Sequence, residues 1–145
     1  MAAQILALLE LDENSRRVVE SLERSGHVVE VAETFTKAMF ILQTPHQIDL
    51  IISDVHLENG GNVFDFLRWM KKNPATHEAL FVMFSCEPTA TAKYLEDGIR
   101  TSARMLGVAK YITMESFDAD EFRKQIDSLL PIGEQAAELS PHRKR

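Results

Sequence analysis

The sequence is short of cysteine, of basic charge and of long apolar runs, and each shortage excludes a class of protein. It contains one cysteine, Cys86, so no disulfide can form within the chain, which is typical of the reducing cytoplasm. No segment reaches the roughly 20 consecutive apolar residues of a membrane-spanning helix, so we expect no contact with a membrane. No basic stretch precedes the first apolar run, and a signal peptide is therefore not expected.

The balance of charge is acidic. The 145 residues include 16 Lys and Arg against 22 Asp and Glu, a formal net charge of -6. Binding to nucleic-acid phosphates requires a basic face, so we expect no partner of that class. Basic residues gather only at 142–145, within a stretch over 131–145 that we interpret as a solubilising tail or linker. The remaining residues, 1–130, have the length of one domain.

Apolar runs alternate with amphipathic stretches five times along the chain. The run at 4–9 is too uniformly apolar for a half-exposed strand, and strands buried on both faces with crossover helices between them indicate a parallel sheet covered on both sides. We predict an α/β fold, a (βα)5 doubly wound five-stranded parallel sheet in a three-layer sandwich. Strands are predicted at 4–9, 27–32, 49–53, 79–85 and 109–113. Helix ends are predicted at Asp12, Gly26, Thr34, Pro45, Asn62, Pro74, Gly107, Asp118 and Pro131. The fourth helix is predicted to run through Tyr94, Leu95, Ile99, Ala103 and Leu106.

Polar side chains follow several predicted strands, where functional groups gather in sheets of this kind. These residues are Glu10, Asp54, Ser85 and either Thr113 or Met114. Asp54 ends the apolar run of LIISDVHLENGG, and a loop with two glycines follows it. Its carboxylate is either a reactive group at the rim of the sheet or a cap on the following turn.

The order of elements resembles the receiver domains of two-component response regulators, the CheY-like fold, over roughly residues 4–130. Three stretches carry the resemblance: LERSGHVVEVAET, LIISDVHLENGGNVFDFLRWMKK and MLGVAKYITMESFDADEFRKQI. The resemblance implies that Asp54 is the phosphoacceptor. It also implies that Ser85 is the hydroxyl that contacts the phosphoryl group, and that Tyr111 is the aromatic switch residue.

Two positions depart from the family pattern. The acidic pair that holds Mg²⁺ after the first strand falls here on Leu9 and Glu10. A one-residue slip would give Glu10 and Leu11, and a bulge would bring in Asp12. After the fifth strand the stretch 113–116, which includes Met114 and Glu115, contains neither residue of the family's Lys-Pro pair and is one residue longer. Mg²⁺ takes carboxylate oxygens, and phosphoryl transfer requires positive charge around the transferred group. We therefore expect weak Mg²⁺ binding at Glu10 and Asp54, and an impaired phosphoryl site.

The resemblance also implies partners. A histidine kinase or phosphotransfer protein would supply the phosphoryl group. A partner protein or a second receiver would contact the face formed by the fourth helix, fifth strand and fifth helix. The passage from Ser85 to Gly107 is longer than the family's, with an enlarged loop at 88–91, which predicts a changed partner set. We expect a cytoplasmic signalling domain that is not an enzyme.

Two alternatives stay open. One is a pseudo-receiver that contacts partners without phosphorylation. The other is a flavodoxin-like module that binds a small ligand, although the acidic, glycine-free turn at 10–14 would repel a phosphate. His56 makes DVHLENGG similar to the D-x-H-x-x-G of cobalamin-binding domains, but the glycine comes one place late. Cys86 is interpreted as a small apolar filler.

Overall fold

The computed structural model describes residues 3–130 except 11, 46 and 56–61, and within them five strands alternate with five helices. The strands are β1 (Gln4–Leu8), β2 (Val28–Ala32), β3 (Leu50–Asp54), β4 (Leu80–Cys86) and β5 (Lys110–Met114). The helices are α1 (Glu13–Arg24), α2 (Phe35–Gln43), α3 (Val63–Lys72), α4 (Ala90–Met105) and α5 (Ala119–Asp127). The predicted order is confirmed, and β3, β4 and β5 each begin and end one residue later than predicted. His56, the glycine loop, Pro131 and the proposed tail lie outside the described residues.

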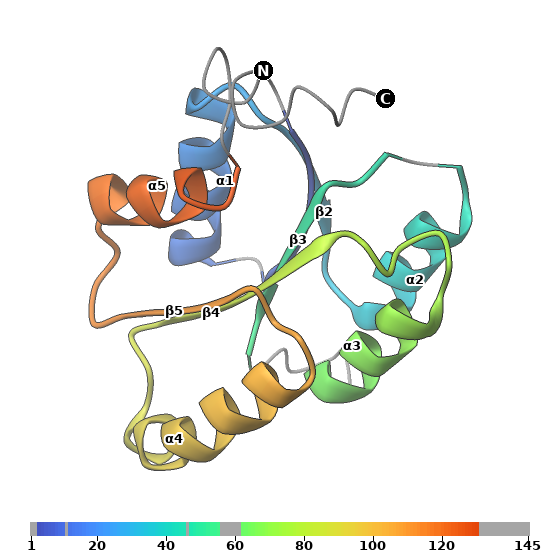
Figure 1. Cartoon of the computed structure of the whole chain (residues 1–145). Helices are drawn as coiled ribbons and strands as arrows, with labels where there is room; N and C mark the ends of the chain where they lie inside the picture. The colour runs from blue at the N-terminus through green and yellow to red at the C-terminus, as the bar shows by residue number, and fades with distance from the viewer. Residues whose placement is uncertain (1–2, 11, 46, 56–61, 131–145) are drawn as a thin grey trace.

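The strands form one parallel sheet in the order β2-β1-β3-β4-β5. Helices α1 and α5 cover one face, and α2, α3 and α4 cover the other (Figure 1). The chain passes from β1 outward to β2, then returns across β1 to β3, so the winding direction reverses between β1 and β3. The doubly wound three-layer fold is therefore confirmed, and its switch point lies beside the end of β3.

The core has two layers because side chains alternate across the sheet. Leu6 and Leu8 of β1 join the cluster beneath α2 and α3, whereas Ile5 and Ala7 join the cluster beneath α1 and α5. Both sets are buried, which explains why the first strand is uniformly apolar. Burying one large apolar side chain stabilises a fold by about 1.5–3 kcal/mol.

Side-chain caps start the helices at the predicted positions. Asp12 Oδ1 accepts a hydrogen bond from the Ser15 backbone N–H at 2.8 Å, and Asp118 Oδ1 accepts one from Glu121 at 3.1 Å. At the other end of α4, Gly107 has φ +88°, a left-handed conformation that L residues with a Cβ rarely adopt. These contacts confirm the predicted start of α5 and the predicted end of α4.

Helix α4 has less of a core face than its apolar residues suggested. Ala103 is its one fully buried residue, while the side chains of Tyr94 and Leu95 are 86% and 46% exposed. The helix lies over β4 and the edge strand β5, so its outer flank has no neighbouring element of the sheet to cover it (Figure 1). No described helix is long and apolar enough to cross a bilayer.

Candidate functional site

Asp54 is the last residue of β3 and lies at the carboxyl edge of the sheet, beside the switch point. Its Oδ2 accepts a hydrogen bond from the backbone N–H of Glu10 at 3.0 Å. This bond joins the loop after β1 to the end of β3 and orients a carboxylate that is half-buried. The backbone that follows β1 therefore positions the aspartate that ends β3.

A cavity of about 240 Å³ opens over this edge, and we call it the Asp54 cavity. It is lined by Glu10, Asp12, Asp54, Val55, Phe84, Ser85, Cys86, Glu87, Pro88, Thr89 and Ala92. The structure therefore brings together three of the residues singled out in the sequence, Glu10, Asp54 and Ser85. The predicted loop at 88–91 is shorter than expected, because α4 already begins at Ala90; Pro88 and Thr89 line the cavity, and Thr89 caps α4.

Burial and neighbouring charges make Asp54 hard to ionise. The pKa of Asp54 is raised from 3.8 to about 7, chiefly because burial removes water from the carboxylate and secondarily because of the negative charges of Asp12 and Glu10. The hydrogen bond from the Glu10 backbone acts in the opposite direction and lowers the pKa. A substantial fraction of Asp54 is therefore protonated near neutral pH, and a protonated carboxyl is a poor nucleophile.

Apolar, buried side chains lie at two positions where the resemblance implied charged groups. Leu9 is 1% exposed and Met114 is 7% exposed, and both belong to the core layer beneath α1 and α5. Neither position supplies an oxygen ligand or a cation to the Asp54 cavity. The edge therefore holds more negative charge than positive charge.

The carboxylates of the described residues show which side chains would hold Mg²⁺. Within the described residues, no group of three or more His, Cys, Asp or Glu side chains is placed to hold a metal ion. Glu10, Asp12 and Asp54 line the cavity, and Asp12 Oδ1 also accepts the hydrogen bond that caps α1. Because Mg²⁺ is usually held by one or two carboxylates together with water, Glu10 and Asp54 are the residues that would hold it here.

Glu115 has a partner that the sequence did not indicate. Lys93 of α4 donates to the Glu115 carboxylate at 3.1 Å, across the gap between α4 and the loop after β5. The side chains are 50% and 79% exposed, so the pair lies at the surface beside Ala92, which lines the cavity. The two residues are separated by 22 positions in the sequence, too far for a helical spacing pattern to relate them.

Tyr111 lies apart from the Asp54 cavity. Its half-buried ring stacks under the Arg100 guanidinium, whose Cζ is 4.4 Å from the ring centroid. Glu96 accepts a hydrogen bond from Arg100 Nε at 2.8 Å. Burial, and secondarily the charge of Glu96, raise the pKa of the Tyr111 hydroxyl. The structure therefore does not bring the proposed aromatic switch residue together with Ser85 and Asp54.

Two residues of the cavity wall have unusual properties. Glu87 has φ +53°, the one positive φ among described non-glycine residues, and its N–H donates to Met114 O at 2.8 Å. Backbone strain of this kind concentrates at functional sites, and no sequence signal marked Glu87. Burial raises the pKa of the Cys86 thiol to about 11, so the thiolate is scarce at neutral pH. That value agrees with the interpretation of Cys86 as a filler.

Comparisons with known proteins identify the fold. No family model and no curated protein sequence matches the chain. The chemotaxis response regulator CheY4 of Vibrio cholerae superposes with a TM-score of 0.73 and 18% identity over 90% of this chain and 100% of that chain. A putative response regulator from Chloroflexus aurantiacus superposes with a TM-score of 0.70 and 17% identity, over 91% of this chain and 100% of that chain. The non-phosphorylated HemR receiver domain from Leptospira biflexa superposes with a TM-score of 0.70 and 24% identity, over 90% of this chain and 96% of that chain. The chain has the CheY-like fold of response regulator receiver domains.

Proposed function

We propose that the chain is a receiver-like domain of a two-component phosphorelay, that it signals by protein contacts, and that Asp54 is its phosphoacceptor. The observation that carries the proposal is the position of Asp54 at the end of β3, in one cavity with Ser85. In this role Ser85 would contact the phosphoryl group and a histidine kinase or phosphotransfer protein would donate it. The domain itself would act as a cytoplasmic signalling module, not as an enzyme.

The same cavity predicts slow phosphorylation. Transfer of a phosphoryl group to a carboxylate brings two anions together and depends on nearby positive charge. Leu9 and Met114 supply none, and burial favours the protonated form of Asp54. We propose that Mg²⁺ binds weakly, through Glu10 and Asp54, at millimolar concentration.

A phosphorylation-independent pseudo-receiver is the second candidate, and the burial of both Leu9 and Met114 in the core favours it. In either case we propose that a partner protein or a second receiver contacts α4, β5 and α5. Tyr94 and Leu95 give this face exposed apolar area that the fold leaves uncovered. A small phosphate-bearing ligand is disfavoured, because Glu10, Asp12 and Glu87 line the cavity with negative charge.

Incubation with acetyl phosphate and Mg²⁺, followed by intact-mass measurement, tests the proposal. We expect one phosphoryl adduct on the wild-type protein, formed slowly and only at millimolar Mg²⁺, and none on Asp54→Asn. Beryllofluoride should shift amide resonances around Ser85 in the wild type alone. Identical behaviour of the two proteins would assign the pseudo-receiver role, and saturation by micromolar Mg²⁺ would contradict the weak metal site.

A further inference from the structure

We propose that the ends of α3 and α4 and the start of β5 form a docking surface for an acidic, partly apolar peptide segment of a partner protein. The surface consists of Lys71, Arg104, Met105 and Lys110, and we call it the basic edge. Lys110 is the first residue of β5 and Asp54 is the last residue of β3. Because the strands are parallel, Lys110 lies at the amino ends of the strands and Asp54 at their carboxyl ends. The surface shares α4 and β5 with the partner face proposed above, so the inference rests on that part of the proposed function, but it does not depend on chemistry at Asp54.

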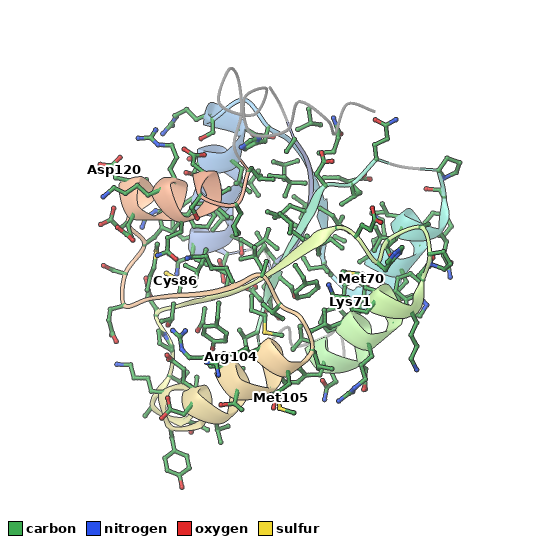
Figure 2. The ribbon with its side chains drawn as sticks, viewed as in Figure 1. Met70, Lys71, Cys86, Arg104, Met105 and Asp120 are labelled. Atoms are coloured by element: carbon green, nitrogen blue, oxygen red, sulfur yellow. The ribbon has the colours of Figure 1, made fainter. Side chains whose placement is uncertain are left out.

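Cations from three elements converge around Gly107. Lys71, in the last turn of α3, lies against Gly107, since its Cε and Nζ are 3.4 and 3.6 Å from the position that a Cβ on Gly107 would occupy. Arg104 is in the last turn of α4, and Lys110 follows Gly107 at the start of β5. Figure 2 shows Lys71 on α3 and Arg104 and Met105 on α4 at neighbouring helix ends.

The basic edge includes a hollow. A cavity of about 220 Å³ is lined by Arg104 and Lys110, with apolar contributions from Ala103 and Val108. Arg100 lines it too, but Glu96 and the Tyr111 ring already hold its guanidinium. A carboxylate entering this hollow would therefore meet Arg104 and Lys110 first.

The charges of the basic edge are unmatched. Within the described part of the chain, no ion pair or side-chain hydrogen bond involves Lys71, Arg104 or Lys110. Lys71 and Lys110 are half-buried and Arg104 is exposed. By contrast, Arg16, Arg68, Lys93, Arg100 and Arg123 all have carboxylate partners. A set of neighbouring cations without carboxylate partners among the described residues is complementary to an anion supplied from outside, in a chain of net charge -6.

Stabilisation of the helix ends accounts for part of this arrangement only. Cations in the last turn interact favourably with the helix dipole, and this applies to Lys71 and Arg104. It does not apply to Lys110, which begins a strand. It also does not explain Arg104 one turn after Arg100, because like charges at this spacing weaken a helix.

Met105 indicates that the ligand is a peptide. Its side chain is 81% exposed beside the cations, and methionine is an adaptable contact for apolar side chains. An acidic segment with an apolar residue would contact both kinds of group, whereas a free inorganic anion would leave Met105 unused. A long nucleic acid would be repelled by the net charge of -6.

Titration of the full chain with a fluorescein-labelled peptide of alternating glutamate and leucine tests the proposal. We expect binding that weakens with salt, and amide shifts concentrated around Gly107. The variant Arg104→Gln/Lys110→Gln should bind about tenfold more weakly, as expected from two lost partly exposed ion pairs. The matched control Arg24→Gln/Lys37→Gln also removes two charges, on α1 and α2, and should bind within about twofold of wild type. Circular dichroism checks that both variants fold.

Three results would overturn the proposal. One is the absence of amide shifts at millimolar peptide, and another is an equal loss of affinity in the two double variants. The third is tighter binding of a DNA duplex than of the peptide, which would assign the surface to nucleic acid. Because these variants leave Asp54 unchanged, a failure here is distinguishable from a failure of the phosphorylation test.

Discussion

The backbone N–H of Glu10 donates to Asp54 Oδ2 at 3.0 Å, so the loop after β1 and the end of β3 share one hydrogen bond across the switch point. The bond can be made to either protonation state of the carboxyl group, because the second oxygen can carry the proton. It holds the side chain in place but does not compensate for the loss of water around it. The carboxylate is therefore well positioned and poorly ionised.

Asp54→Asn should stabilise the protein near and above neutral pH. The folded state holds a proton on Asp54 up to a pKa of about 7, whereas the unfolded chain releases it near 3.8. Between these values the folded state binds more protons, so stability falls as pH rises. Urea unfolding should show equal stability of the two proteins near pH 3.5, if both remain folded there. By pH 8 we expect an advantage of roughly 2–4 kcal/mol for Asn.

A control for this prediction is Asp120→Asn, on the exposed first turn of α5. We expect it to leave the dependence of stability on pH close to that of the wild type. A wild-type protein that is more stable than Asp54→Asn at pH 8 would contradict the desolvation of the carboxylate.

His27 should make the stability of the protein depend on pH in the direction opposite to that of Asp54. It is 4% exposed, its Nδ1 accepts a hydrogen bond from the Ala3 N–H at 3.1 Å, and its Nε2 is buried without a partner among the described residues. Burial lowers the pKa of His27 below 6.5, although the charges of Asp127 and Asp49 oppose the shift. The unfolded chain therefore takes up a proton first, and stability falls as pH drops below about 6.5.

The contribution of His27 is measurable in the Asp54→Asn background, where the opposing slope from Asp54 is removed. His27→Phe should flatten the loss of stability between pH 6.5 and 5, whatever its effect on absolute stability. His77→Phe is the control, because His77 is an exposed histidine outside the core. Unchanged slopes in His27→Phe would show that His27 is not the titrating group.

At Glu87 the usual order of stability, in which an alanine variant is more stable than a glycine variant, should be reversed. At φ +53° a side chain costs about 1–2 kcal/mol, so Glu87→Gly should be more stable than Glu87→Ala by about 1 kcal/mol. At Glu20, which is exposed within α1, alanine should be the more stable by about 1 kcal/mol. Chemical denaturation of the four variants compares the stability of glycine with that of alanine at each position. A more stable alanine variant at both positions would rule out strain at Glu87.

Phe122 should be essential for the attachment of α5. Its ring is fully buried and lies 5.6 Å from the Phe84 ring and 5.5 Å from the Phe117 ring, centroid to centroid. Phe122→Ala removes these contacts and leaves a cavity, which should lower the free energy of unfolding by about 3–5 kcal/mol. The exposed Phe40→Ala on α2 should change it by less than about 1 kcal/mol, and similar losses would contradict the assigned burial.

The architecture was predictable because it depends on local patterns. Apolar strands indicated burial on both faces, which holds for β1 and β3 but not for the edge strand β2, where most side chains are exposed. Asp12, Thr34 and Asp118 marked helix starts that the structure confirms. Parallel strands then place their carboxyl ends at one edge, so Asp54 and Ser85 were expected to lie close together. Such predictions need only the periodicity of the chain and the geometry of the fold.

The parts that were not predictable depend on contacts between distant segments. The Lys93–Glu115 pair joins α4 to the loop after β5, and the conformation of Glu87 is set by its bond to Met114 O. The placement of Tyr111 against Arg100 likewise depends on how α4 lies beside β5. The apolar residues of α4 were predicted only to belong to one helix, and whether such residues are covered depends on the neighbours of the helix, which its own sequence does not encode.

The single buried residue of α4 has a consequence for how this domain can vary. Ala103 is the one fully buried residue of α4, and Ile99 packs against the same core layer, so substitutions on the exposed flank of the helix leave the packing of the sheet unchanged. The surface of this helix and the stability of the fold are then set by different residues. A sequence could diverge along the exposed flank of α4, and the domain would still fold.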